Sequence, residues 1–162
     1  MPEPIAGALF YLYLIVDIWS RKIVGWDVYE RETAESAAQI LKRAVWTKNC
    51  FTTPLVLHAD NGSPIKGATM KTTMERLDVT ASFSRPRVSN DNAFSKALLT
   101  CQYVPGWLAR GFATVEEAWV WVQGFVRWYN PGHRHSAIRF VTPDQRHPGD
   151  DRLFLANRHQ VY

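Results

Sequence analysis

Two β-rich runs joined by a short connection constrain the fold of this chain more than any other feature. The first run, Leu9 to Val16, is continuously apolar and contains three aromatic side chains, and the second extends from Ile23 to Tyr29. The mostly polar connection between them, 17–22, is long enough only for a turn. Runs separated by so short a connection pair as antiparallel strands. We therefore expect a sheet that begins with a hairpin of two long strands.

Helical and extended patterns alternate after the hairpin. Thr33 is a suitable N-cap for an amphipathic helix to about Trp46, because small and apolar residues recur behind it at helical spacing. A short strand is expected at Leu55 to His58. A helix near Thr69 to Leu77 and another strand, Val79 to Phe83, follow it. This order of elements indicates a mixed α/β fold.

Two further helices are expected in the C-terminal half. One begins at Ser89 or Asn90 and places Lys96 near the boundary between its apolar and polar faces. The last clear helix opens with a capping box, Thr114 to Glu117, and ends at Asn130-Pro131-Gly132. No linker-like or repeated stretch interrupts the 162 residues, so we expect one domain, 1–162.

Composition narrows the cellular setting without identifying a function. The net charge of +4 and the pI near 9.2 fit a polyanionic partner, although an excess of this size is common in proteins that bind no nucleic acid. The chain has no apolar run of about 18 residues and no signal-peptide pattern at its start, so we expect a cytoplasmic protein. Its two cysteines, Cys50 and Cys101, form no CxxC pair and are expected to be reduced.

Asp60 is the first candidate for chemistry. It follows the short apolar strand directly and precedes Asn61-Gly62, so a tight turn holds its carboxylate at the rim of the sheet. In open α/β sheets ligands and catalytic groups collect at this rim, and the placement suits a metal ligand. From this position alone, an Asx turn or a loop cap is the simpler explanation. Asp60 becomes informative only in its wider sequence context.

Several motifs follow one another in order and at regular spacing: His58-Ala59-Asp60-Asn61-Gly62-Ser63-Pro64, then Ser84 to Ser95, Phe125 to Asn130, His133 to Ile138 and Val141-Thr142-Pro143. Over nearly the whole chain they strongly resemble the retroviral-type integrase core of bacterial insertion-sequence transposases of the OrfB type. The resemblance implies a ribonuclease-H-like mixed sheet flanked by helices. It also implies cleavage and transfer of DNA strands by two divalent ions, Mg²⁺ or Mn²⁺, held by an Asp, Asp, Glu triad. Asp60 matches the second aspartate.

The position of the family's glutamate is where this chain departs from the pattern. Thirty-five residues intervene between the second aspartate and that glutamate in the family, and the same spacing from Asp60 leads to Lys96. Mg²⁺ requires hard oxygen ligands, whereas an ammonium offers no lone pair, repels a cation and can pair with Asp60 itself. Asp91 lies near the expected helix start, where capping is its expected duty. We do not expect it to replace the glutamate.

The first aspartate of the triad also has no match. Asp17 lies in the segment from Val16 to Arg21, which matches the family's second strand and the turn after it. On this alignment the chain begins after the first, central strand, so it is truncated at its N-terminus, and its C-terminus is a second place where truncation is expected. We expect Asp17 to position the turn through Ser20 or Arg21. Asp60 then remains as a single, vestigial metal ligand.

These departures predict a core that is related to DNA integration and transposition but is catalytically inactive, retains weak DNA binding and binds no metal. The alternatives are an active enzyme whose partner supplies the missing acids and an inhibitory partner of an intact transposase. The absent central strand leaves two strand edges facing a gap, and unpaired edges recruit partners. We expect direct pairing of the neighbouring strands or strand exchange in a homodimer.

Five basic residues are candidates for contacts to DNA phosphates, which need only positive charge: Arg85, Arg87, Lys96, Arg134 and Arg139. Ordinary solvated surface charge explains them equally well. Three histidines in the same half of the chain, His133, His135 and His147, match no common zinc-finger spacing and have no cysteine close by. We therefore expect no zinc site.

Overall fold

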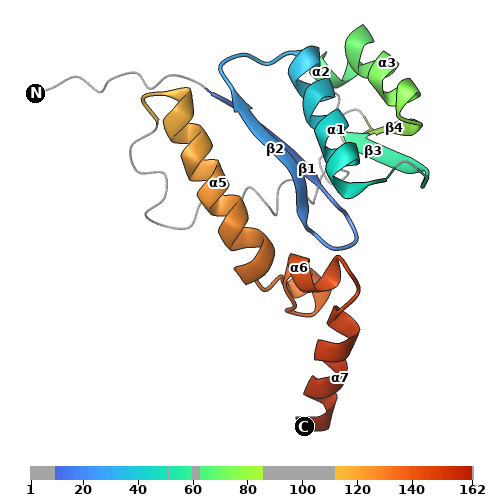
Figure 1. The fold of residues 1–162 in the computed structure, drawn as a ribbon, viewed down its shortest axis with the longest axis vertical. Helices are drawn as coiled ribbons and strands as arrows, with labels where there is room; N and C mark the ends of the chain where they lie inside the picture. The colour runs from blue at the N-terminus through green and yellow to red at the C-terminus, as the bar shows by residue number, and fades with distance from the viewer. Residues whose placement is uncertain (1–9, 51, 60–62, 86–111, 162) are drawn as a thin grey trace, which may run out of the picture.

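The computed structural model describes residues 10–50, 52–59, 63–85 and 112–161. Figure 1 shows the arrangement of the elements. In chain order, the elements before the gap at 86–111 are β1 (Tyr11–Val16), β2 (Ile23–Tyr29), α1 (Ala34–Lys48), β3 (Leu55–Ala59), α2 (Ser63–Lys66), α3 (Ala68–Arg76) and β4 (Val79–Phe83). After it come α5 (Val115–Gly132), a 3₁₀ turn (Ser136–Ile138), α6 (Pro143–Arg146) and α7 (Asp151–Val161).

The hairpin forms as the sequence predicts. β1 and β2 pair antiparallel, with Leu14 opposite Trp26, and the register shifts between Ile15 and Val16 at the end of β1. The connecting turn is closed by a 2.9 Å hydrogen bond from the backbone N–H of Asp17 to the carbonyl of Lys22. The side chains of β2 alternate between the two faces of this pair, so each face needs its own cover.

Helices α1 and α5 cover the two faces of the hairpin, as Figure 1 shows. Helix α1 packs very closely against β2 at Gly25, because a Cβ added there would lie 3.1 Å from the Cβ of Ala44. On the α5 side, Phe125 is 1% exposed and packs in one cluster with Ile23 and Trp26. The hairpin is therefore the middle of three layers.

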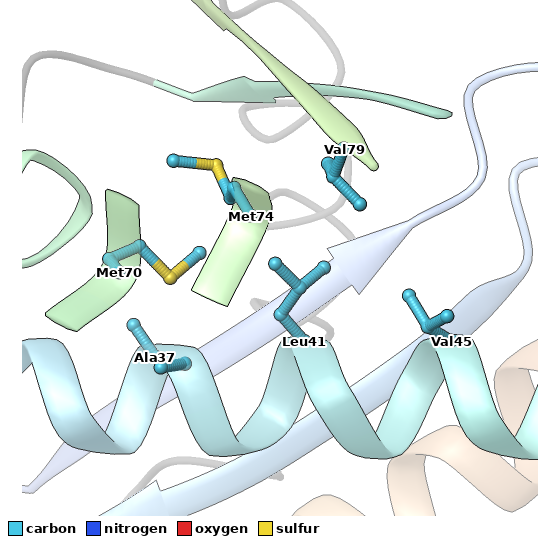
Figure 2. Close-up of a cluster of buried hydrophobic side chains, with 7 residues drawn as sticks. Ala37, Leu41, Val45, Met70, Met74 and Val79 are labelled. Atoms are coloured by element: carbon cyan, nitrogen blue, oxygen red, sulfur yellow. The ribbon is translucent and has the colours of Figure 1, made fainter. Parts of the chain in front are cut away.

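The second sheet is the parallel pair β3 and β4, with Leu55 opposite Val79 and Ala59 opposite Phe83. Helices α1 and α3 bury its inner side in one apolar cluster. Figure 2 shows most members of that cluster converging from α1, α3 and β4: Ala37, Leu41, Val45, Met70, Met74 and Val79. Helix α1 thus joins the two sheets, since it packs on both.

The two sheets remain separate in the described part of the chain. Each contains two strands, and β1 does not pair with β3. Tyr13 and Ile15 of β1 nevertheless pack against the same cluster beneath α1 as Leu55 and Leu57 of β3. Direct pairing of the neighbouring strands, one of the two expected outcomes, is therefore wrong for these strands. Packing beneath a shared helix replaces it.

Most expected elements occur within a residue or two of the expected bounds. Helix α5 ends at Gly132, within the expected terminus Asn130-Pro131-Gly132, and it includes Pro131, with His133 as its C-cap. Proline is tolerated there because the last turn still closes through a 3.2 Å bond from the His133 N–H to the Tyr129 carbonyl. At the other end, Thr114 caps the Glu117 N–H, but Glu117 accepts from Ala113, so the capping box is only half formed.

Three short elements after α5 were not expected from the sequence. Thr142 and Gln145 form a complete capping box at the start of α6, and α7 begins at Asp151. Four residues are too few to show a helical period, so α6 is not predicted from the sequence pattern.

The expected helix from Ser89 or Asn90 lies outside the described residues. Among the described helices, none combines the length and apolar composition needed to cross a bilayer.

Candidate functional site

The carboxyl ends of β3 and β4 form the rim from which the Asp60 loop departs. Asp60 itself lies outside the described residues, but the residue before it is firmly held. The Ser84 N–H donates to the Ala59 carbonyl at 3.0 Å, which extends the parallel ladder by one bond beyond β4. The point where the loop begins is therefore fixed by the backbone of the neighbouring strand.

His58 adds a second tie at the same rim. Its Nδ1 lies 3.0 Å from the Ser82 hydroxyl, and its Nε2 lies 3.3 Å from the Ser84 hydroxyl. A neutral imidazole can donate at one nitrogen and accept at the other, so two hydroxyls satisfy both. This cross-strand set locks the ring one residue before Ala59. This role was not expected from the sequence, because it depends on the parallel register of β3 and β4.

Two basic side chains emerge beside this rim. Arg85 follows Ser84 and is exposed. Lys66, the last residue of α2, is also exposed, and its ammonium lies 5.6 Å from the ring centroid of Phe83. Lys66 was not among the candidates from the sequence. Arg87 and Lys96, which were, lie outside the described residues.

The Asp17 carboxylate is hydrogen-bonded within the hairpin turn, as expected. It accepts hydrogen bonds from the Ser20 N–H at 3.1 Å, from the Ser20 hydroxyl and from the Trp19 N–H at 3.4 Å. Burial alone would raise the pKa of Asp17, but these bonds, together with one to His147, outweigh it and hold the pKa below its ordinary value. The carboxylate thus stays charged and engaged by the turn.

The same turn is joined to α6 by a polar network. His147 Nδ1 lies 3.1 Å from the fully buried Ser20 hydroxyl and 3.3 Å from Asp17. Both contacts fall on one ring nitrogen, so the group is not a catalytic Ser-His-Asp relay, which needs a different nitrogen for each partner. Lys22 pairs with Asp144 at 2.8 Å beside it. The arrangement is a structural lock between the hairpin and α6.

The remaining described candidates, Arg134 and Arg139, lie in the turn between α5 and α6, and both are exposed. Arg139 and Phe140 have left-handed backbones, with φ of 61° and 58°. Their carbonyls accept hydrogen bonds from Arg158 of α7 at 3.0 and 3.2 Å. Helix α7 therefore stabilises a backbone conformation that non-glycine residues rarely adopt.

The three histidines do not converge on a common point. His133 stacks on Tyr129 with ring centroids 5.2 Å apart, whereas His147 is bonded to the hairpin turn. His135 accepts from the Ala137 N–H at 3.1 Å. Burial lowers the pKa of both His133 and His135. The described residues include no group of three His, Cys, Asp or Glu side chains placed to hold a metal ion.

Comparison with known proteins gives consistent matches. Residues 2–89 match the family described as the integrase core domain. The chain is 26% identical over 136 residues to the transposase InsF for insertion sequence IS3A of Escherichia coli K12, covering 83% of this chain and 47% of that protein. It is 25% identical over 141 residues to the transposase for insertion sequence element IS904 of Lactococcus lactis, covering 86% of this chain and 55% of the relative.

A solved structure resembles the fold despite low sequence identity. A chain of the simian T-cell lymphotropic virus intasome in complex with PP2A regulatory subunit B56 gamma superposes with a TM-score of 0.69 at 14% identity. The match covers 88% of this chain and 50% of the viral one. The fold is thus ribonuclease-H-like α/β, as expected. The chain spans about half the length of the curated relatives it matches.

Proposed function

Because this chain belongs to the integrase core domain family, we propose that it binds the DNA backbone weakly and does not cut it. It is a homologue of the cores of insertion-sequence transposases, the enzymes of transposition. One observation carries the proposal: thirty-five residues separate Asp60 from Lys96, the spacing at which the resemblance implies the family's metal-binding glutamate. The relatives are bacterial, and since bacterial DNA lies in the cytoplasm, we propose that compartment.

The donor set does not fit the two divalent ions, Mg²⁺ or Mn²⁺, that serve the family. Two ions roughly 3.5–4 Å apart activate the attacking hydroxyl and stabilise the leaving oxygen, and each requires oxygen ligands. A lysine ammonium contributes no lone pair, and its charge opposes that of the ions. Asp60 and Lys96 are instead suited to form an ion pair with each other, which makes Asp60 a vestigial ligand.

The position of Asp17 supports the loss of a second acid. It directly follows β1 in the sequence, and it accepts several hydrogen bonds from its own turn and one from His147. A carboxylate engaged in this way would have to give up those bonds to bind a metal ion. We therefore propose Asp60 as the single acid of the triad.

Exposed arginines support the proposed binding of DNA. Arg85, Arg134 and Arg139 all present their side chains to solvent, and the net charge is +4. We include Arg87 and Lys96 in the same set on the sequence alone. Contacts of this kind neutralise phosphates without reading bases, so binding is expected to be independent of sequence and sensitive to salt.

A gel-shift titration tests this binding. The full chain is titrated onto a mixed-sequence duplex at several salt concentrations, and we expect retention that weakens steeply between about 50 and 200 mM salt. Replacing Arg134 and Arg139 together by alanine should weaken retention and flatten the salt dependence, whereas replacing the ion-paired Arg43 should not. Absence of retention at the lowest salt would refute the proposed DNA binding.

The split sheet favours a second candidate function, association with another integrase-type chain. β1 and β3 pack beneath the same helix without pairing, and unpaired strand edges recruit strands from other chains. A homodimer is the simplest product, and pairing with an intact transposase would make this chain an inhibitor. Sedimentation tests the first possibility, and a strictly monomeric species would rule it out.

Mixing the chain with an intact relative separates inhibition from partner-assisted activity. Falling strand transfer by the relative indicates a poisoned mixed oligomer. Metal-dependent nicking that requires this chain, when added to a relative whose own second aspartate has been replaced, would instead show that a partner supplies the missing acids, because Asp60 would then complete the triad with the relative's first aspartate and glutamate.

A further inference from the structure

Lys66 is held over an aromatic ring at the rim that carries the Asp60 loop. Its ammonium lies 5.6 Å from the centroid of Phe83, the last residue of β4. Phe83 is opposite Ala59 in the parallel register, and Ala59 directly precedes Asp60. The charge of Lys66 is therefore placed beside the end of the strand from which the family motif departs.

The Phe83 ring does not neutralise the charge of Lys66. Lys22, by contrast, pairs with the Asp144 carboxylate at 2.8 Å. No ion pair joins Lys66 to a carboxylate in the described part of the chain. An aromatic ring attracts a cation through its quadrupole but carries no net charge. Lys66 is thus held in place and still able to bind an anion.

The surroundings favour a phosphate as that anion. Lys66 and Phe83 are both exposed, and Arg85 emerges two residues beyond Phe83. Ligands of open α/β sheets bind at the carboxyl ends of the strands, which is this rim. We propose that Lys66, ordered by Phe83, binds a phosphate of the DNA backbone at the Asp60 rim. This inference rests on the proposed DNA binding and adds a residue to it.

Fluorescence anisotropy with a labelled mixed-sequence duplex, repeated at several salt concentrations, tests the role of Lys66. Lys66→Ala should lower affinity roughly 3- to 10-fold at about 50 mM salt and reduce the slope of log K against log salt by about one. Lys66→Arg should retain both. Lys42→Ala removes the same charge from an exposed position on α1 and should change affinity less than about 2-fold.

Phe83→Leu tests whether the ring orders the lysine. It keeps the charge and should give a loss smaller than that of Lys66→Ala with an unchanged slope. Equal affinities and slopes for Lys66→Ala and Lys42→Ala, with salt-dependent binding by the parent chain, would overturn the role of Lys66 alone. If the parent chain does not bind the duplex, both this role and the proposed function are wrong. Circular dichroism of each variant confirms that the fold is retained.

Discussion

Replacing Asp17 by alanine tests whether this acid serves the hairpin turn. The carboxylate accepts from the Ser20 N–H at 3.1 Å, the Ser20 hydroxyl and the Trp19 N–H at 3.4 Å, and lies 3.3 Å from His147. A hydrogen bond to a charged group contributes about 1.5–3 kcal/mol. Most of these bonds share one oxygen, and the side chain is 31% exposed, so water replaces part of the loss. We expect the free energy of unfolding to fall by about 2 kcal/mol.

Urea unfolding followed by tryptophan fluorescence measures this change. Glu30→Ala is the matched control, because Glu30 is an exposed acid for which the described structure has no side-chain hydrogen bond, and we expect it to stay within about 0.5 kcal/mol of the parent. The loss in Asp17→Ala should be the same with EDTA and with Mg²⁺. If Asp17→Ala is as stable as the control, Asp17 does not stabilise the turn. If Mg²⁺ stabilises the parent chain but not the variant, Asp17 binds the metal ion.

The pH dependence gives a second measure of the same group. The folded pKa of Asp17 lies below its ordinary value, so folding favours the charged form. Its contribution is complete above the ordinary aspartate pKa and is lost as the pH falls through the folded value. The stability of Asp17→Ala should therefore decline less between neutral and acid pH than that of the parent chain. Parallel declines would contradict the lowered pKa.

Three further predictions concern the core and the histidines. Phe125→Ala should lower the free energy of unfolding by about 3–5 kcal/mol in urea, because Phe125 is 1% exposed, and a loss below about 1 kcal/mol would contradict its packing. Gly25→Ala should cost about 1–3 kcal/mol, since its new Cβ would lie 3.1 Å from Ala44, and a stabilised variant would contradict this contact. Burial lowers the pKa of His133 and His135, so their contribution is full above the ordinary histidine pKa and declines below it. Thermal melting from pH 7.5 to 5 should show this decline weakened in His133→Gln, and an unchanged pH profile would count against it.

Much of the fold follows from local patterns. The hairpin is predicted because two apolar runs flank a connection too short for anything but a turn, and β2 has the expected bounds. Thr33 and Thr114 cap α1 and α5, because each threonine side chain accepts a hydrogen bond from a backbone N–H in the first turn of its helix. Helix α7 could not be predicted in this way. Its position depends on tertiary contacts, such as the hydrogen bonds from Arg158 to the backbone carbonyls of Arg139 and Phe140.

In the candidate site, too, local relations can be predicted from the sequence and long-range contacts cannot. The turn role of Asp17 follows from its position three residues before Ser20, a local relation visible in the sequence. The ties of His58 to Ser82 and Ser84 depend on the parallel register of β3 and β4, which is set by two strands about 24 residues apart. The contact of Lys66 with Phe83 likewise depends on how α2 packs beside the end of β4. Such long-range relations leave no period in a single sequence.

A plasmid-nicking assay tests the central claim most directly. Supercoiled DNA is incubated with the parent chain and with Lys96→Glu in Mg²⁺ and in Mn²⁺, next to an intact relative as the positive control. We predict no nicking above background from either protein, because under the proposed assignment Asp17 is not the first acid, so the reversion restores only the glutamate. Metal-dependent nicking by the parent chain would contradict the claim that this core has lost its chemistry. Nicking by Lys96→Glu alone would show that Asp17, despite its hydrogen bonds in the turn, serves as the first acid.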